Sequence, residues 1–332
     1  MYDDLEEQWE ETPADPRDPG DAFIPEDSVY RHDPAGAHRE RFAGLPIVEP
    51  GDPCADPWQA AWVLWDGAST DGGAGSSLAD DLSELIGRVG GQRIQAIVVA
   101  GEDASGAPEV LAAHAHRLPR LRSVFLGFVE PEHWEISWIR QGDITPLLEA
   151  FPRLERLDVR GSDGLVMRPV RHEHLRVLRF ECGGLPAHVV RAVGDSHLPG
   201  LAHLELWLGV EQYGGDSTTA DLAGILGGAG LPALRRLGLR DSERQDEIAS
   251  AVAAAPVVAR LEALSLGMGV LTDAGAEALL SGQPLSHLQH LDLHHNYLSE
   301  ETAARVEKAL PTVTVDLSHR YTHDEFYVAV SE

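Results

Sequence analysis

Apolar residues recur along residues 94–318 in groups that occupy the first, fourth and sixth positions of a short segment. Leu154, Leu157 and Val159 form one such group, and the groups begin at residues 94, 121, 154, 175, 201, 234, 261 and 288. Successive groups are 27, 33, 21, 26, 33, 27 and 27 residues apart. Because alternate side chains of a strand point to opposite faces, the fourth and sixth positions share one face. Each group therefore predicts a short strand with one buried face.

The segments between these strands favour helices, because they carry apolar residues at helical spacing. The predicted helices cover residues 107–117, 144–151, 186–194, 219–228, 244–255, 272–282 and 299–310. One strand with one helix cannot bury its apolar face alone, whereas stacked units share a continuous core. The expected fold class is an α/β solenoid. It would form a curved leucine-rich repeat horseshoe, with a parallel β-sheet on the concave face and helices on the convex face.

Both ends of the repeat array, residues 93–318, need a cover. Residues 42–92 predict an N-terminal capping strand, "AWVLW" at 61–65, followed by a capping helix. Ser77 with Asp80 three residues later is typical of a capping box at the start of that helix. Apolar and polar residues alternate near the C-terminus, so residues 319–332 predict a C-terminal capping strand.

Residues 1–41 form an acidic, proline-rich segment. Its first 27 residues hold eleven acids, four prolines and a single base, Arg17. Such a composition cannot bury enough apolar surface to offset the entropy lost on ordering, so a disordered tail is expected. An alternative stays open, because Tyr2, Leu5 and Trp9 would line one face of a short acidic helix. That helix could bind a basic partner or this protein's own arginines.

One repeat matches the leucine-rich repeat pattern in full, through Leu288, Leu291, Leu293, Asn296 and Leu298. The chain therefore resembles ribonuclease-inhibitor-like leucine-rich repeat proteins over residues 94–318. It is also similar to an uncharacterised, actinobacterial-looking family of cytoplasmic leucine-rich repeat proteins, through "ISWIRQGDITPLLEAFPRLERLDVRG", "HLELWLG", "QPLSHLQHLDLHHNYLSEE" and "YVAVSE". This resemblance implies a fold and a cytoplasmic location but no activity. The other repeats replace the asparagine with Ser162, Gly183, Gly209, Ser242 or Gly269.

The charge of the chain limits the classes of partner, and its cysteine content indicates the cellular compartment. The net charge of −28 argues against binding to nucleic acid or to an anionic membrane. No run is long and apolar enough for a membrane span, and "MYDDLEEQWEE" has no signal-peptide pattern. Cys54 and Cys182 provide neither a disulfide framework nor a zinc-binding spacing, which fits the cytoplasm. We expect no cofactor.

The strand positions that alternate with the apolar ones indicate a recognition surface. In four of the middle strands they hold five arginines and three acids, although the whole chain is acidic. We predict that a protein partner contacts Arg156, Arg160, Arg179, His203, Trp207, Arg236, Arg240, His290, Asp292 and His294. The alternative is internal pairing, because Asp158 would lie beside Arg179 and Arg160 beside Glu181 on neighbouring strands. By the same reasoning Arg156, Arg236 and Arg240 lack a carboxylate at their own level.

The stretch "HLQHLDLHH", residues 287–295, raises the question of a metal site. His290, Asp292 and His294 alternate on one strand, so their side chains would share a face and could bind zinc or iron. A relay of Ser265, His290 and Asp292 is a weaker alternative, since nothing marks an oxyanion hole. The leading hypothesis is a non-enzymatic protein-interaction scaffold. The alternatives are a metal-dependent enzyme that uses this cluster, and an inhibitor or immunity protein whose acidic surface covers a basic target.

Overall fold

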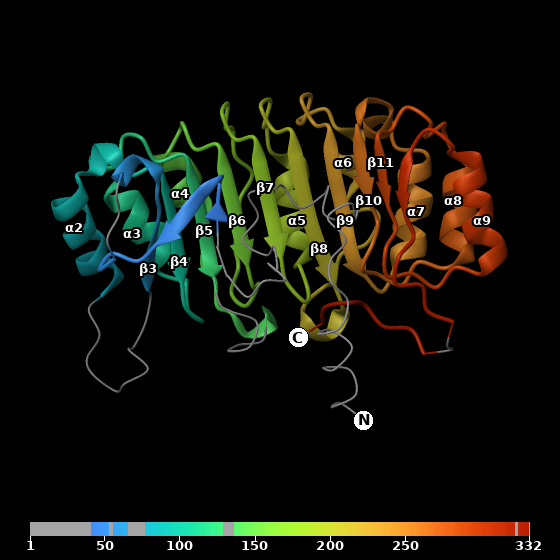
Figure 1. Ribbon diagram of the computed structural model, residues 1–332, viewed down its shortest axis with the longest axis horizontal. Coiled ribbons are helices and arrows are strands. Elements are labelled where there is room, and N and C mark those ends of the chain that lie inside the picture. The colour runs from blue at the N-terminus through green and yellow to red at the C-terminus, as the bar shows by residue number, and fades with distance from the viewer. Residues whose placement is uncertain (1–40, 53–55, 66–76, 129–135, 323–324, 332) are drawn as a thin grey trace.

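The computed structural model describes residues 41–52, 56–65, 77–128, 136–322 and 325–331. These residues form a twelve-stranded sheet in which the strands follow one another in chain order. Only β1 and β2 pair antiparallel within it. The strands are β1 (Arg41–Phe42), β2 (Leu45–Val48), β3 (Ala61–Trp65), β4 (Ala96–Ala100), β5 (Ser123–Phe128), β6 (Arg156–Arg160), β7 (Val177–Glu181), β8 (His203–Gly209), β9 (Arg236–Ser242), β10 (Ala263–Ser265), β11 (His290–Asp292) and β12 (Thr314–Asp316). Figure 1 shows them side by side along the long axis of the molecule.

The strands pair in the register that the apolar groups predicted. Leu157 lies opposite Leu178, and the same level continues through Leu204 and Leu237 to Leu264. Because side chains alternate between the two faces, this register places all these leucines on one face of the sheet. The prediction of an open α/β solenoid with a mostly parallel sheet is confirmed.

All seven predicted return helices form, and so does the helix after "AWVLW". The helices are α2 (Leu78–Val89), α3 (Ala107–Ala113), α4 (Thr145–Ala150), α5 (Ala187–Asp195), α6 (Ala223–Gly227), α7 (Gln245–Ala253), α8 (Asp273–Ser281) and α9 (Glu300–Ala309). The Ser77 hydroxyl caps α2 by accepting a hydrogen bond from the amide of Asp80, as the capping box predicted. The short interval between β6 and β7 contains no helix.

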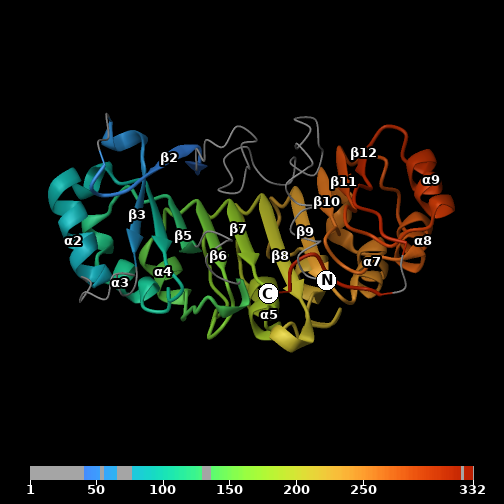
Figure 2. The same ribbon diagram turned by 60° about the horizontal axis from the view of Figure 1, so that its bottom comes forward.

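The helices lie on one side of the row of strands, as Figure 2 shows. The apolar strand side chains pack there against helix residues such as Leu82, Val190 and Val252 in one continuous core. We call the opposite side of the sheet the open face. It carries the strand positions that alternate with the core leucines.

A hairpin that the sequence analysis missed covers the N-terminal part of the open face. Its two-residue turn, Ala43 and Gly44, has positive φ angles of 53° and 76°, which suit the twist of paired strands. Phe42 contacts Phe125 of β5 edge to face, with ring centroids 5.8 Å apart. With neighbouring residues they form a second apolar cluster, on the open face. In Figure 1 the hairpin crosses in front of this part of the sheet. The predicted disordered tail lies outside the described residues, apart from Arg41.

The C-terminal segment runs back along the sheet instead of forming a capping strand. Residues 325–331, which we call the C-terminal strap, contain no strand. The amide of Ala329 donates to Met268, that of Val330 donates to the Asp241 carboxylate, and the Ser331 carbonyl accepts from Ser137. Figure 1 shows the strap passing below the strands toward β8. The capping strand predicted from the alternation of apolar and polar residues therefore does not form in this segment.

Asp241 links the strap to β9 and makes stability depend on pH. Its side chain is fully buried, and burial raises its pKa well above the ordinary 3.8, against the bonds from Val330 and Ala329 and the charge of Arg240. A raised pKa in the folded state stabilises the protein at low pH, and this stabilisation is lost as the pH rises through that pKa. Asp241→Asn keeps an acceptor for Val330 without the charge. We expect the variant to gain stability over the wild type as the pH rises from about 4 toward neutrality. Urea unfolding at several pH values tests this, and a difference that does not change with pH would contradict it.

Buried amide side chains bind the backbone where strands leave the sheet. The Asn296 amide, at the asparagine position of the repeat pattern, donates to the carbonyl of Leu293 and accepts from the amide of Leu298. In the repeat of β9, Gln245 donates to Leu239 and accepts from the amide of Ser242. Gln245 therefore makes the two backbone hydrogen bonds that asparagine makes after β11, although it lies three residues beyond the asparagine position, which Ser242 occupies here.

Candidate functional site

Arg179 stands at the centre of a buried ionic network on the open face. One Nη atom lies 3.4 Å from Asp158 of β6, and the other lies 2.7 Å from Glu181 and 3.3 Å from Glu205 of β8. Its side chain is 2% exposed. Register explains the contacts with Asp158 and Glu205, because these residues and Arg179 lie at one level of three adjacent strands. Glu181 lies two residues farther along the strand of Arg179.

The network extends to both sides of Arg179. Toward the N-terminus, Arg156 contacts Asp158 at 2.6 Å and Arg160 contacts Glu181 at 3.2 Å. Toward the C-terminus, Arg240 lies 3.2 Å from Glu205 and 3.7 Å from Asp292. Four arginines thus face four carboxylates, and their charges cancel. The ionic network is therefore neutral when His203 and His294, which contact two of the carboxylates, are neutral.

These contacts correct part of the sequence analysis. Internal pairing of Asp158 with Arg179 and of Arg160 with Glu181 is confirmed. Arg156 and Arg240 have no carboxylate at their own level on an adjacent strand, as expected, but each still pairs with a carboxylate elsewhere. Arg156 bonds to Asp158 two residues along its own strand, and Arg240 reaches Asp292 across β10. Arg156 also lies over the ring of Phe42, 5.1 Å from its centroid.

The ionic network holds Arg179 and Glu205 in their charged forms. Burial alone would lower the pKa of Arg179, but the charges of Glu205, Glu181 and Asp158 outweigh burial and raise it. Burial alone would raise the pKa of Glu205, but Arg179 and Arg240 hold it well below its usual range. For His203, burial and the nearby arginines outweigh the contact with Glu205 and lower the pKa. His203 is therefore neutral near pH 7.

The predicted partner-binding residues differ in accessibility. Arg156, Arg160, Arg179, His203, Arg240 and Asp292 are buried. Arg236 is exposed at the start of β9, while Trp207, His290 and His294 are partly exposed. The indole of Trp207 donates to Glu205 at 2.9 Å, which anchors one end of the ring and leaves the rest at the surface.

The histidines of residues 287–295 do not converge on one point. His287 bonds to the carbonyl of Val258, and His295 bonds to that of Tyr327 in the strap. His294 turns to Asp292, with Nδ1 2.6 Å from Oδ1. The side chain that joins this pair is Asp316, which sits opposite Asp292 on β12. Asp316 was not predicted, because residues 313–317 match the repeat pattern poorly, although Asp316 occupies the strand position equivalent to Asp292.

The relay of Ser265, His290 and Asp292, which was the weaker alternative, does not form. The Ser265 hydroxyl donates to Oδ2 of Asp292 at 2.6 Å. A serine bonded directly to a carboxylate has no imidazole base to take its proton. Ser265 is therefore a support for Asp292 in this arrangement.

Cys182 is buried just after β7, with Sγ 3.4 Å from the carbonyl of Trp207. Burial raises the pKa of its thiol to about 12, so the reactive thiolate is scarce at neutral pH. We expect Cys182 to resist thiol reagents in the native protein and to react at once after unfolding in urea. The measurement uses a Cys54→Ser variant, and rapid modification without urea would show that the thiol is accessible.

Comparison with known proteins supports the fold. No protein-family model matches the chain, and neither does any curated protein. A Bacteroides fragilis protein with a crystal structure from the Northeast Structural Genomics Consortium is similar, with a TM-score of 0.72 and 29% sequence identity. The match covers 80% of this chain and 76% of that one. A leucine-rich repeat protein of Leptospira interrogans matches 71% of this chain and 63% of its own, at 16% identity. Its TM-score of 0.29 does not establish a shared fold.

Within the described residues, every helix is too short or too polar to cross a membrane.

Proposed function

We propose that this chain is a cytoplasmic, non-enzymatic scaffold of the leucine-rich repeat type, which binds a partner protein on the open face. We further propose that the stack curves like a horseshoe, with the open face on its concave side. Stacked repeats build an extended surface of this kind, and many of them use it for binding. The regular register of β3 to β12 and the amide-bonded turn at Asn296 support this assignment.

The observation that carries the proposal is the contrast between a buried, neutral ionic network and the side chains that rise above it. Trp207, Arg236, His290 and His294 are accessible, and they lie on strands β8, β9 and β11 or just beyond. Trp and Arg dominate the energetics of protein interfaces. In this view the buried arginines hold the surface rigid, and the accessible group contacts the partner.

The test compares two double variants. Trp207→Ala with Arg236→Ala removes accessible groups from the proposed surface. Trp65→Ala with Arg171→Ala is the control, because Trp65 is 53% exposed on the distant strand β3 and the Arg171 side chain is 70% exposed. Arg156 and Arg240 are unsuitable, since their loss would leave buried carboxylates unpaired.

Affinity capture from bacterial lysate with mass spectrometry provides candidate partners, and purified candidates provide Kd values. We expect the first variant to weaken binding about thirtyfold or more, as loss of an interface hot spot does. The control should bind like the wild type. Equal binding by both variants, at unchanged thermal stability, would rule out this surface.

A further inference from the structure

The C-terminal part of the open face carries a group of side chains suited to a different ligand. We propose that Asp292, His294 and Asp316 bind a divalent transition-metal cation. The site goes beyond the proposed scaffold function, and its test needs no partner protein.

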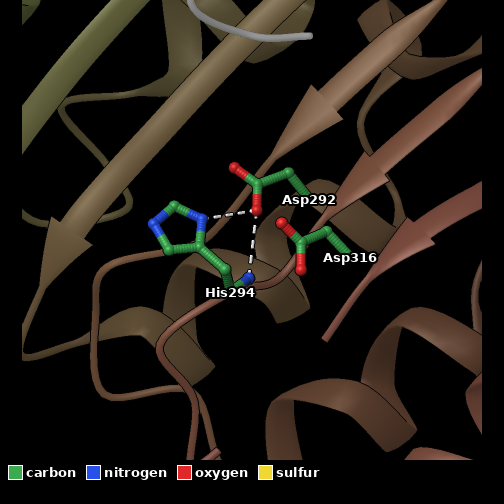
Figure 3. Close-up of side chains that lie close together, drawn as sticks. All are labelled: Asp292, His294 and Asp316. Carbon is green, nitrogen blue, oxygen red and sulfur yellow. Dashed lines mark hydrogen bonds and ion pairs between the residues drawn. The ribbon is translucent and has the colours of Figure 1, made fainter. Parts of the chain in front are cut away.

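The three residues come from neighbouring parts of the fold. Asp292 ends β11, Asp316 ends β12 at the same level, and His294 follows β11 by two residues. One nitrogen or oxygen ligand atom from each lies within 4.8 Å of the other two. Figure 3 shows the Asp292 carboxylate between the imidazole and the second carboxylate. Bound to one ion, the three would provide one nitrogen and two oxygen ligands.

Charge at the site favours a cation. Asp292 and Asp316 are 1% and 5% exposed, and they face each other on adjacent strands. Arg240 is an ion-pair partner of Asp292, 3.7 Å away. Asp316 forms no ion pair with any described arginine, lysine or histidine, and its carboxylate accepts a hydrogen bond from the amide of Ser318. A buried carboxylate beside a second one is costly unless a positive charge compensates it.

The backbone at Gly267 packs closely beside two of the ligand atoms. Gly267 lies at the level of His294, and a Cβ there would come within 2.7 Å of Nδ1 of His294 and 3.1 Å of Oδ1 of Asp292. A side chain at residue 267 would therefore crowd both atoms and disturb their approach to a common ion. One imidazole with two carboxylates suits zinc, manganese or iron(II), and three protein ligands leave positions for water.

Metal binding at Nδ1 of His294 requires that the proton on this atom moves and that the contact between His294 and Arg240 breaks. Nη2 of Arg240 lies 3.4 Å from Nε2 of His294, and because a guanidinium only donates, Nε2 accepts and Nδ1 carries the proton toward Asp292. A metal on Nδ1 moves this proton to Nε2, which then faces Arg240. The guanidinium must therefore turn toward Glu205, which already holds its Nη1 at 3.2 Å.

The experiment uses the full chain without an affinity tag and Co²⁺ as the probe. Visible absorption of bound Co²⁺ reports its coordination, and competition with Zn²⁺ reports affinity. Asp316→Asn removes a ligand charge but keeps an oxygen for the Ser318 amide. Gly267→Ala keeps all three ligands and crowds Nδ1 of His294. Asp143→Asn is the control, since Asp143 is a surface carboxylate paired with Arg168.

We expect the wild type and Asp143→Asn to bind one Co²⁺ per chain, which Zn²⁺ displaces. Asp316→Asn and Gly267→Ala should each raise Kd tenfold or more, with thermal unfolding of the metal-free proteins as the check on folding. No stoichiometric Co²⁺ or Zn²⁺ binding by the wild type would overturn the proposal. So would binding to Asp316→Asn with wild-type affinity and spectrum, because the ion would then lie elsewhere among the 16 histidines of the chain.

Discussion

Arg179→Met is expected to lower the free energy of unfolding by about 3 to 5 kcal/mol, the usual cost of removing one partner from a buried ion pair. The loss is large because Asp158, Glu181 and Glu205 all face the same guanidinium, and none of them is more than 1% exposed on its side chain. Methionine fills much of the space but leaves negative charges without compensation. Urea unfolding measured at neutral pH gives the difference.

A control for this prediction lies three residues away on the chain. The Arg176 side chain is 70% exposed and lies 3.8 Å from Glu155. Arg176→Met should cost about 1 kcal/mol or less, as surface ion pairs do. If both substitutions cost the same, Arg179 is not the centre of a tightly coupled network.

A second variant separates lost charge from lost packing. Adding Glu205→Gln to Arg179→Met removes one of the carboxylates left unpaired. The double variant should then lose less stability than the sum of the two single variants, because neighbouring charges are not additive. A strictly additive result would assign the cost of Arg179→Met to packing.

The strand register and two pairings of the ionic network could be predicted from the sequence. A repeated pattern of period two fixes which residues share a face, and the spacing of repeats fixes which ones are neighbours. The pairs Asp158–Arg179 and Arg160–Glu181 follow directly from this register. Contacts between adjacent strands need no knowledge of side-chain conformation.

Contacts that reach across an intervening strand could not be predicted from the register. Arg240 reaches Asp292 and His294 across β10 because Ser265 ends that strand and Gly267 follows just beyond it. An arginine can cross a neighbouring strand only where small residues leave space. Predicting this requires the volume of every side chain at that level, in addition to the register.

Segments outside the repeats were also missed or misassigned. The hairpin of residues 41–48 and the C-terminal strap are each bound by unique contacts, such as Phe42 with Phe125 and Val330 with Asp241. No repeated pattern indicates such contacts. Asp316 was missed for a related reason, since the final repeat lacks most of the leucines that mark the others.

Asn296→Ala and Gln245→Ala test whether the two amides play the same part. Each side chain is fully buried, donates to a backbone carbonyl at 2.8 Å and accepts from a backbone amide. The Asn296 amide also reaches the Leu317 carbonyl at 3.4 Å. Removal of either side chain leaves two buried groups without partners, at about 1 to 3 kcal/mol each. We therefore expect each substitution to lower the free energy of unfolding by about 2 to 6 kcal/mol. The control is Gln289→Ala at an exposed site, which should change stability by about 0.5 kcal/mol or less.

The double variant tells whether the turns are independent. Asn296 follows β11 and Gln245 follows β9, and they share no bonding partner, so their losses should add. A cost for Gln245→Ala as small as that for Gln289→Ala would show that the turn after β9 does not depend on an amide. Comparable costs would mean that the fold requires an amide at the strand exit and accepts it from more than one position. A search for such repeats that requires asparagine would then miss repeats in which another residue supplies the amide.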